Sequence, residues 1–235
     1  MFKTILASIL FLAIPQAEEK QGAAEFLAAV ESLYLGADTL QWKGTFKIER
    51  VTPEGSNEVG SAEVEAAFKK ANRVRVQLKA KEGGSEIRSD GIALLFNPGR
   101  RPHRGATPKS LDANVRIILI RAGVEMASLS RAIRQDLDLE TVTKRLSLSE
   151  IRWGKVDKIE GKDIKTVEYV LSAVVDDSKS EYKVKLWVDP KTHHVLRRVM
   201  ENPAQGLRIT ETYSSISINA KLEDTHFAVP IEDKK

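Results

Sequence analysis

The chain has 235 residues, of which 42% are hydrophobic and 30% are charged, and this excludes a collagen-like, low-complexity or mostly disordered chain. The formal net charge of +4 comes from 37 Lys and Arg residues against 33 Asp and Glu residues spread along the sequence. A nucleic-acid binder would usually carry a clustered basic stripe, so we expect no nucleic-acid partner. The absence of cysteine excludes disulfides, thiolate metal sites, a cysteine nucleophile and an acylated lipoprotein N-terminus.

The first seventeen residues have the pattern of a secretory signal peptide. Lys3 precedes an apolar run from Ile5 to Ile14, and Ala17 supplies a small residue for cleavage. A membrane-spanning helix needs about 20 apolar residues, which is roughly twice this run. We therefore predict that residues 1–17 are removed on export, that residues 18–235 form a single domain, and that the mature chain resides in the periplasm.

Apolar spacing along the first half of the mature chain predicts one helix followed by about five strands. The helical spacing ends at Gly36, which is typical of a helix C-terminus. Beyond it apolar and charged residues alternate, as on strands with one dry and one wet face. The helix is indicated by Phe26, Leu27, Val30, Leu33 and Tyr34, and the strands by segments 40–49, 62–69, 73–79 and 87–96, with turns at 53–57, 70–72, 81–84 and 90–91.

The second half begins with a basic loop, Asn97–Lys109, and a helical insert. Ser110 is a candidate N-cap for a helix from Leu111 to Ala122, which Gly123 interrupts. From Ile151 onward the period of two returns and predicts about five more strands. The insert is extended by a possible second helix at Met126, Leu129 and Ile133, and the last strand, 207–218, has a phase slip at Ser214–Ser215 that predicts a bulge.

Connections of hairpin length predict a mostly antiparallel sheet in an α+β fold. Because the strands have one apolar and one charged face, we expect the sheet to curl over its dry side, with the helical segments covering that side. A closed core and an apolar cleft for a hydrophobic ligand share this residue pattern, so the pattern leaves both open. The largest side chains of the dry face are Trp42, Phe46, Phe68, Val76, Leu78, Leu94 and Phe96.

Motifs for catalysis, metal binding or cofactor binding are lacking in the sequence. It has no nucleophile elbow, zinc-protease helix, phosphate loop or dinucleotide fingerprint. The adjacent His193 and His194 would point to opposite faces of a strand and could not both bind one metal ion. We therefore expect no enzyme, no metal site and no cofactor. The basic cluster Gly99–Arg104 fits either contact with anionic headgroups or an acidic partner, or a solvated loop.

Three segments resemble the LolA-like family of periplasmic lipoprotein carriers. Ser89–Pro98, with its Ser-Asp-Gly and Asn-Pro pairs, resembles one hairpin of that family. Leu186–Thr192 resembles its late hairpin, and Ile218–Pro230 resembles its C-terminal segment. Each motif is short, but they occur in the family's order and, with the N-terminal helix, span most of the mature chain.

The resemblance implies an incomplete, strongly curved antiparallel β-barrel, with the N-terminal helix and the helical insert as a lid over an apolar cavity. It implies a monomeric carrier of lipoprotein acyl chains or lipid, with a membrane-associated donor or acceptor protein as a further partner. The alternative on the same fold is a periplasmic sensor or protein-interaction module with a filled core. The expected cavity residues are Trp42, Phe46, Ile48, Val64, Phe68, Val76, Leu78, Leu94, Phe96, Ile118 and Leu119.

The resemblance also implies a latch for the lid at the turn Lys69–Asn72. The family has an arginine there that binds lid carbonyl groups, and Lys70 takes its place in this sequence. Lysine is a point donor without the planar fork of arginine, so it would bind carbonyl groups less specifically.

Overall fold

A computed structural model of the chain describes residues 22–99, 101–124, 135–175 and 178–230. The predicted signal peptide, 1–17, and the predicted helix at Met126, Leu129 and Ile133 lie outside the described residues. Within the described ranges one sheet of 11 strands is covered by three α-helices. The helices are α1 (Ala23–Gly36), α2 (Leu111–Ala122) and α4 (Leu139–Arg145), and a 3-10 helix, η2, spans Asp224–Phe227.

Antiparallel pairing joins all neighbouring strands, in the order β6-β5-β4-β3-β2-β1-β11-β10-β9-β8-β7. Hairpins link successive strands in each half, and β1 joins the two halves by pairing with β11. The strands are β1 (Thr39–Thr52), β2 (Gly55–Lys69), β3 (Arg73–Ala80), β4 (Gly83–Asp90), β5 (Ala93–Asn97), β6 (His103–Ala106), β7 (Leu146–Ile159), β8 (Lys162–Val175), β9 (Ser178–Val188), β10 (Val195–Asn202) and β11 (Leu207–Ile218).

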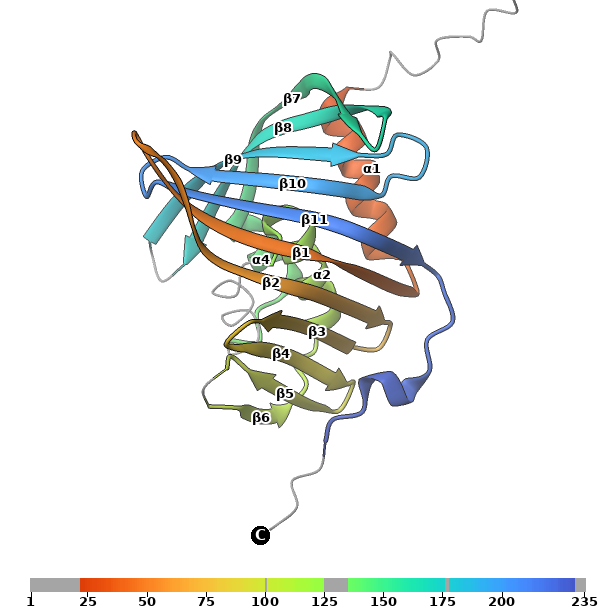
Figure 1. The fold of residues 1–235 in the computed structure, drawn as a ribbon. Helices are drawn as coiled ribbons and strands as arrows, with labels where there is room; N and C mark the ends of the chain where they lie inside the picture. The colour runs from red at the N-terminus through yellow and green to blue at the C-terminus, as the bar shows by residue number, and fades with distance from the viewer. Residues whose placement is uncertain (1–21, 100, 125–134, 176–177, 231–235) are drawn as a thin grey trace, which may run out of the picture.

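The position of the helical insert follows from this strand order. Strands β6 and β7 form the two edges of the sheet, so the chain between them must cross the sheet from one side to the other. Helices α2 and α4, which lie between them in the sequence, are on the concave face next to α1, behind the central strands in Figure 1, and both contact β7. The ring centroids of Phe26 in α1 and Trp153 in β7 are 5.1 Å apart. The predicted fold class, an α+β fold with an open, strongly curved sheet and helices over one face, is confirmed.

Several local differences separate the fold from its prediction, and helix α4 (Leu139–Arg145) is one element that was not predicted. The loop predicted at 97–109 contains β6, and Arg104 within it donates from Nη1 to the carbonyl oxygen of Pro230 at 2.7 Å. Ser110 precedes α2 as predicted, but its side chain makes no capping hydrogen bond. The bulge predicted near Ser214 is confirmed, because Lys43 pairs with Ser215 and the next residue, Gly44, pairs with Tyr213.

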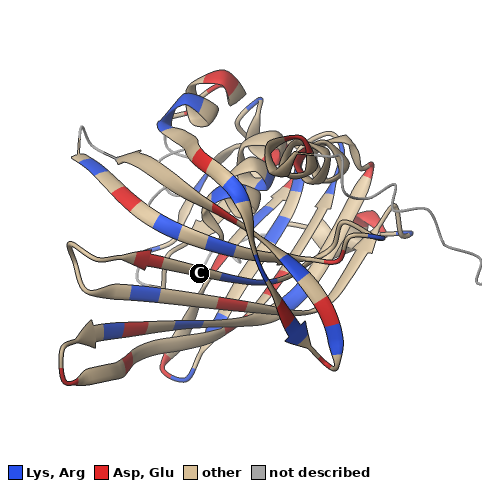
Figure 2. Ribbon diagram, turned by 90° about the horizontal axis from the view of Figure 1, so that it is seen from above, with Lys and Arg blue, Asp and Glu red and all other residues tan. Residues whose placement is uncertain are grey.

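Charge patterning agrees with a sheet that has one covered face. Lys and Arg residues alternate with Asp and Glu residues along the strands rather than gathering by sign (Figure 2). The large exposed hydrophobic residues of the described part of the chain are scattered at Val59, Ile92 and Val156. In the same residues, no helix is both long and apolar enough to cross a membrane.

Candidate functional site: the helix-covered face of the sheet

The residues predicted to line a cavity come together on the concave face and on α2. Nine of the eleven are buried, and Phe46 and Ile48 are partly buried against the same core. They pack with buried residues of α1, including Val30 at 0% and Tyr34 at 1% exposure. The structure therefore gathers these side chains into one continuous apolar cluster.

Among the described residues, the space at the C-terminal end of α2 is small. A cavity of about 10 Å³ lies between the C-terminal end of α2 and the sheet, and it is lined by Tyr34, Trp42, Leu119, Ile120, Val195, Arg198, Tyr213 and Ile216. A volume of about 10–15 Å³ is what one water molecule needs. The space at this end of α2 therefore fits no more than about one water molecule, and an acyl chain would need the helix to move away from this part of the sheet.

A buried ion pair stands in the middle of this apolar face. Arg198 of β10 and Glu211 of β11 are opposite each other in the strand register, and each side chain is 1% exposed. Arg198 Nη1 lies 2.9 Å from Glu211 Oε2. Burial opposes the charge of Arg198, but the neighbouring carboxylate of Glu211 favours it, and the pKa of the guanidinium lies above its ordinary value. The arginine is therefore a permanent cation inside the core.

The ion pair holds the C-terminal end of α2. Arg198 Nη1 donates to the carbonyl oxygen of Leu119 at 2.9 Å, and Nη2 donates to that of Ile120. Glu211 Oε1 accepts a hydrogen bond from the Val124 amide at 2.6 Å. A helix end leaves backbone groups short of intrahelical partners, and here the two charged side chains supply them. The end of α2 is thereby fixed to the centre of the sheet.

Gly123 makes room for this contact. A Cβ atom at this position would lie 2.1 Å from Glu211 Oε1 and 2.6 Å from Arg198 Nη1. The φ angle of Gly123 is +66°, in the left-handed region that favours glycine. The residue that ends α2 is therefore also the residue that lets both charged groups reach the helix end.

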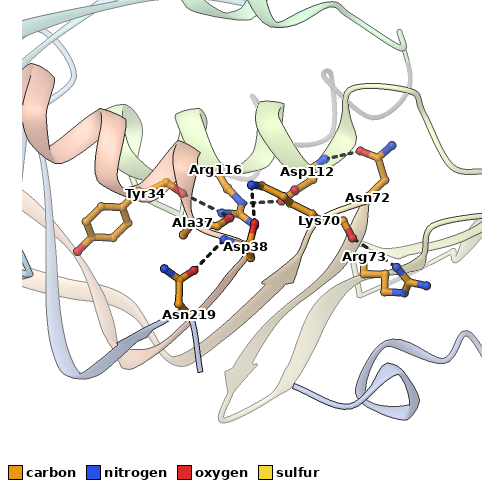
Figure 3. Close-up of polar contacts among 9 residues, drawn as sticks. All are labelled: Tyr34, Ala37, Asp38, Lys70, Asn72, Arg73, Asp112, Arg116 and Asn219. Atoms are coloured by element: carbon orange, nitrogen blue, oxygen red, sulfur yellow. Dashed lines mark hydrogen bonds and ion pairs between the residues drawn. The ribbon is translucent and has the colours of Figure 1, made fainter. Parts of the chain in front are cut away.

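A second buried arginine joins the two long helices. Arg116 of α2 is 1% exposed, and its Nη1 donates to the carbonyl oxygens of Tyr34 and Ala37, both at 2.8 Å (Figure 3). Its Nε donates to Asp112 Oδ1 at 2.6 Å. Burial raises the pKa of Asp112, and the nearby Arg116 partly offsets this effect. A cation at the C-terminal end of α1 also interacts favourably with the helix dipole.

Further contacts hold α2 near both of its ends. At the first turn, the Asp112 amide donates to Asn72 Oδ1 at 3.1 Å, so the turn between β2 and β3 caps the helix (Figure 3). Near its last turn, Arg121 forms a two-pronged ion pair with Glu31 of α1, at 2.8 and 2.9 Å. Arg121 Nη1 also donates to the carbonyl oxygen of Leu146 at 3.0 Å. Helix α2 is thus tied to α1, to the sheet and to the start of β7.

Lys70, the predicted latch, lies beside this network on its solvent side (Figure 3). Its Nζ is 2.5 Å from Asp38 Oδ1, and the hydrogen bond from Lys70 lowers the pKa of Asp38. The two side chains are 58% and 75% exposed, so this is a surface ion pair of small energetic weight. The helix carbonyl groups are bound by Arg116 and Arg198 instead.

The sequence reasoning did not identify Arg116, Arg198 and Glu211 as site residues. Charged residues on strands are normally assigned to the wet face, yet Arg198 is in phase with Met200, and both are buried. A charged residue on the same face of a strand as buried apolar residues was therefore a sequence signal for a buried charge. Arg116 carried a similar signal, because it stands within an almost wholly apolar segment, Val115–Ile120.

The opposite face of the sheet carries an open groove of about 460 Å³. Its lining is contributed by β7, β8, β9 and β10 and consists of Glu150, Arg152, Glu168, Tyr169, Val170, Lys183, Val184, Lys185, Trp187, Val199 and Glu201. The lining mixes three acidic and three basic side chains with apolar ones, and Trp187 Nε1 donates to Asp157 Oδ2 at 3.0 Å. This groove lies outside the helix-covered face.

Comparison with known proteins finds related structures but no sequence match. Neither a protein-family model nor a curated protein sequence matches the chain. A LolA superfamily protein from Nitrosomonas europaea is 14% identical, with 89% of this chain and 98% of that chain covered and a TM-score of 0.38. A domain of an outer-membrane lipoprotein-sorting protein from Vibrio parahaemolyticus is 12% identical. The match covers 88% of this chain and 95% of that chain, with a TM-score of 0.33.

MucB is also among the similar structures. It is 16% identical, with a TM-score of 0.44, and 88% of this chain matches 62% of MucB. A MucA/MucB complex from Pseudomonas aeruginosa has likewise been solved. LolA-superfamily structures are therefore among the matches, as the sequence resemblance predicts, and at these identities the likeness concerns the fold alone.

The buried ion pair leads to a prediction about stability. Glu211→Leu leaves the cation of Arg198 buried without its partner, and we expect it to lower the free energy of unfolding by about 3–5 kcal/mol. The double variant Arg198→Met/Glu211→Leu buries no charge and should recover part of that loss. Urea denaturation followed by circular dichroism measures both.

The control is a second ion pair between the same two strands. Glu201 and Arg208 are opposite each other in β10 and β11 but are 42% and 37% exposed. Glu201→Leu should therefore change the free energy of unfolding by less than about 1 kcal/mol. Equal losses for Glu201→Leu and Glu211→Leu would contradict the weight given to the buried pair.

Proposed function

We propose that this chain is a periplasmic carrier or binding protein for a hydrophobic ligand, acyl chains above all, and that α2 with α1 forms the lid of its binding site. The ligand is held without covalent chemistry. Export rests on the pattern of residues 1–17. The proposed site is the apolar face under α2, together with the predicted lining residues on β1–β5.

The observation that carries the proposal is the way in which α2 is attached. A helix that served only as core would be held most stably by apolar packing, because burying an ion pair costs solvation that its attraction barely repays. Here α2 is held by the Arg198–Glu211 pair at one end and by Arg116 along its length, in addition to the apolar packing of its buried aliphatic residues. Such discrete hydrogen bonds form or break together, which suits an element with two positions.

An entrance lies next to this helix. An open groove of about 390 Å³ runs between α1, α4 and β7, and the Glu31–Arg121 ion pair forms part of its wall. Each methylene buried contributes about 0.8 kcal/mol, so one acyl chain of a dozen carbons offers roughly 10 kcal/mol against the cost of lifting α2. The ligand therefore has to replace the apolar contacts that the buried aliphatic residues of α2 make in this conformation.

A second function is favoured by the groove on the opposite face. That groove has a volume of about 460 Å³, whereas the space at the C-terminal end of α2 has about 10 Å³. A periplasmic sensor or protein-interaction module would use the outer groove for a partner protein and keep the core filled. Crosslinking would then recover a partner through the outer face, and the purified protein would contain no extractable lipid.

A pair of tryptophan variants tests the site of binding. Ile216 lines the small cavity and is partly buried, whereas its neighbour Ser217 is exposed on the other side of β11. We expect Ile216→Trp to obstruct the space under α2 and weaken binding of a fluorescent acyl probe at least tenfold, while Ser217→Trp leaves it unchanged. Fluorescence titration of the mature chain measures both, with circular dichroism as the folding control.

The wild-type titration decides the proposal by itself. Absence of saturable binding of the acyl probe would rule out the carrier and leave the interaction module. Equal weakening by both tryptophan variants would place the probe outside the covered face.

A second pair of variants tests the lid. Glu31→Gln weakens the ion pair between Glu31 of α1 and Arg121 of α2. The two side chains are 15% and 14% exposed. A loss of about 1 kcal/mol in the closed state raises the open fraction, and with it the apparent affinity, about fivefold. Stopped-flow measurement should show the same gain in the association rate of the probe.

The matched control for the lid is Glu140→Gln. Glu140 pairs with Lys144 within α4, where both side chains are more than 70% exposed, so this pair ties no helix to another. We expect no change in probe binding for this variant. If Glu31→Gln also leaves affinity and rate unchanged, movement of the helices does not limit entry.

A further inference from the structure

Residues 219–230, which follow β11, form a strap across the first half of the sheet. The 3-10 helix η2 within this strap contacts β3 and β4 (Figure 1). Arg88 of β4 and Arg104 of β6 donate to the carbonyl oxygens of Ala228 and Pro230, at 3.2 and 2.7 Å. Hydrogen bonds from arginine side chains therefore hold the strap between β4 and the edge of the sheet.

The strap follows one row of the strand register on the outer face of the sheet. From β2 to β6 this row consists of Ala67, Arg75, Arg88, Leu95 and Arg104. Arg75 stands between Val74 and Val76, which are both buried in the core under the helices. Successive side chains of a strand point to opposite faces, so the row points away from that core.

Part of this outer row is apolar and covered. Ala67 is 0% and Leu95 is 7% exposed, although both lie outside the core under the helices. Phe227 of the strap is 0% exposed and likewise lies outside that core. A buried aromatic ring contributes a large apolar area to any contact. The strap therefore covers an apolar seat that is flanked by arginines.

A carboxylate of the strap contacts basic residues next to this row. Asp224 lies 2.6 Å from Lys69 Nζ and 3.4 Å from Arg73 Nη2, and Lys69 also donates to the carbonyl oxygen of Leu222. Four basic side chains thus lose a partner if the strap leaves, namely Lys69, Arg73, Arg88 and Arg104. The surface beneath fits an extended peptide that offers what the strap offers: a carboxylate, an aromatic ring and backbone carbonyl groups.

His226 sits in the strap among positive charges. Its Nε2 is buried and has no hydrogen-bond partner among the described residues. The charged groups that face it are Arg75 of β3, Glu65 of β2, Arg88 of β4 and Lys43 of β1, so cations outnumber carboxylates. Burial, and then the charge of Arg75, lower the pKa of the imidazole below its ordinary value of about 6.5. The docked strap therefore favours a neutral histidine.

Protonation of His226 favours the released strap. A released histidine takes up a proton below about pH 6.5, whereas the docked one resists it. From about pH 7.5 to about pH 5.5 the released fraction can therefore rise by up to about tenfold. The hydrogen bond from Lys69 lowers the pKa of the Asp224 carboxyl, so that contact keeps its charges over this range.

We propose that residues 219–230 are an acid-released strap, which covers a binding surface for an acidic, aromatic peptide segment of a partner protein on the outer face of β2–β6. At neutral pH the strap occupies this surface. In acid the strap leaves, and the partner's segment takes over Lys69, Arg73, Arg88 and Arg104. The inference does not depend on the carrier proposal, because the proposed acyl site lies on the opposite face of the sheet.

Thiol labelling measures the release, since the chain has no cysteine of its own. Leu95→Cys places a thiol under the strap, and Ser217→Cys places a reference thiol at an exposed position of β11. We expect the labelling rate of Leu95→Cys, relative to that of Ser217→Cys, to rise about tenfold from about pH 7.5 to about pH 5.5. Adding His226→Gln should abolish this rise.

The matched control is His194→Gln, in the turn between β9 and β10, where another partly buried histidine has a lowered pKa. This variant should keep the full response to pH. A labelling ratio that does not change with pH, or that rises equally with His226→Gln, would overturn the acid release.

A peptide tests the partner. A fluorescent peptide with the sequence of residues 219–230 and the change His226→Gln does not titrate its own histidine position. By anisotropy we expect it to bind the mature chain about tenfold more tightly at about pH 5.5 than at about pH 7.5, because the docked strap competes with it. Adding Asp224→Lys to the peptide should weaken binding at least tenfold, because it replaces attraction to Lys69 and Arg73 by repulsion.

Three outcomes would overturn the peptide site. They are no binding of the peptide, equal binding at both pH values, and binding that survives Asp224→Lys. Sedimentation with vesicles of phosphatidylethanolamine and phosphatidylglycerol examines the other anionic source. Vesicle binding in acid without peptide binding would assign the surface to lipid headgroups and contradict a protein partner.

Discussion

The structure depends most on one interaction, the ion pair between Arg198 and Glu211 inside an apolar core. The pair determines where α2 ends, because both charged groups need its terminal backbone groups as partners. It requires glycine at position 123, where any side chain would collide with it. Burial and the charge of Glu211 also raise the pKa of Tyr213 well above its ordinary value, so the Tyr213 hydroxyl keeps the proton that it donates to Glu211. A helix, a glycine and a tyrosine are thus organised around two charges that the core must keep paired.

The same interaction connects the fold to the proposed activity. Strands β6 and β7 are the two edges of the sheet, and α2 and α4, which lie between them in the sequence, cover its concave face. The helices on that face are either a permanent part of the core or a lid that can move away from the sheet. Polar ties at both ends of α2 are costly in a permanent core and useful in a lid. On our proposal, the conformation seen here is one of two positions of a lid formed by α2.

Much of the architecture could be predicted from the sequence because it depends on the spacing of apolar residues and on the residues that form turns. Alternation predicted the strands, helical spacing predicted α1 and α2, and the phase slip at Ser214 predicted the bulge. The packed state of the interior could not be predicted, since a core and a cavity use the same apolar side chains. The buried charges were missed for a related reason: only the register, which pairs Arg198 with Glu211, shows that two charges 13 positions apart in the sequence neutralise each other. β6 was missed because its residues are all exposed and carry no alternation.

Native-state hydrogen exchange tests the central claim, that α2 leaves the sheet as a unit while the sheet stays folded. The amide of Val124, which Glu211 holds, reports the opening of the helix end, and the amides of β1 and β11 report global unfolding. The account predicts that Val124 and α2 exchange together at a lower free energy than β1 and β11, and that a bound acyl ligand changes the exchange of α2 alone. Exchange of α2 and the central strands at one common free energy, unaffected by acyl ligand, would contradict it.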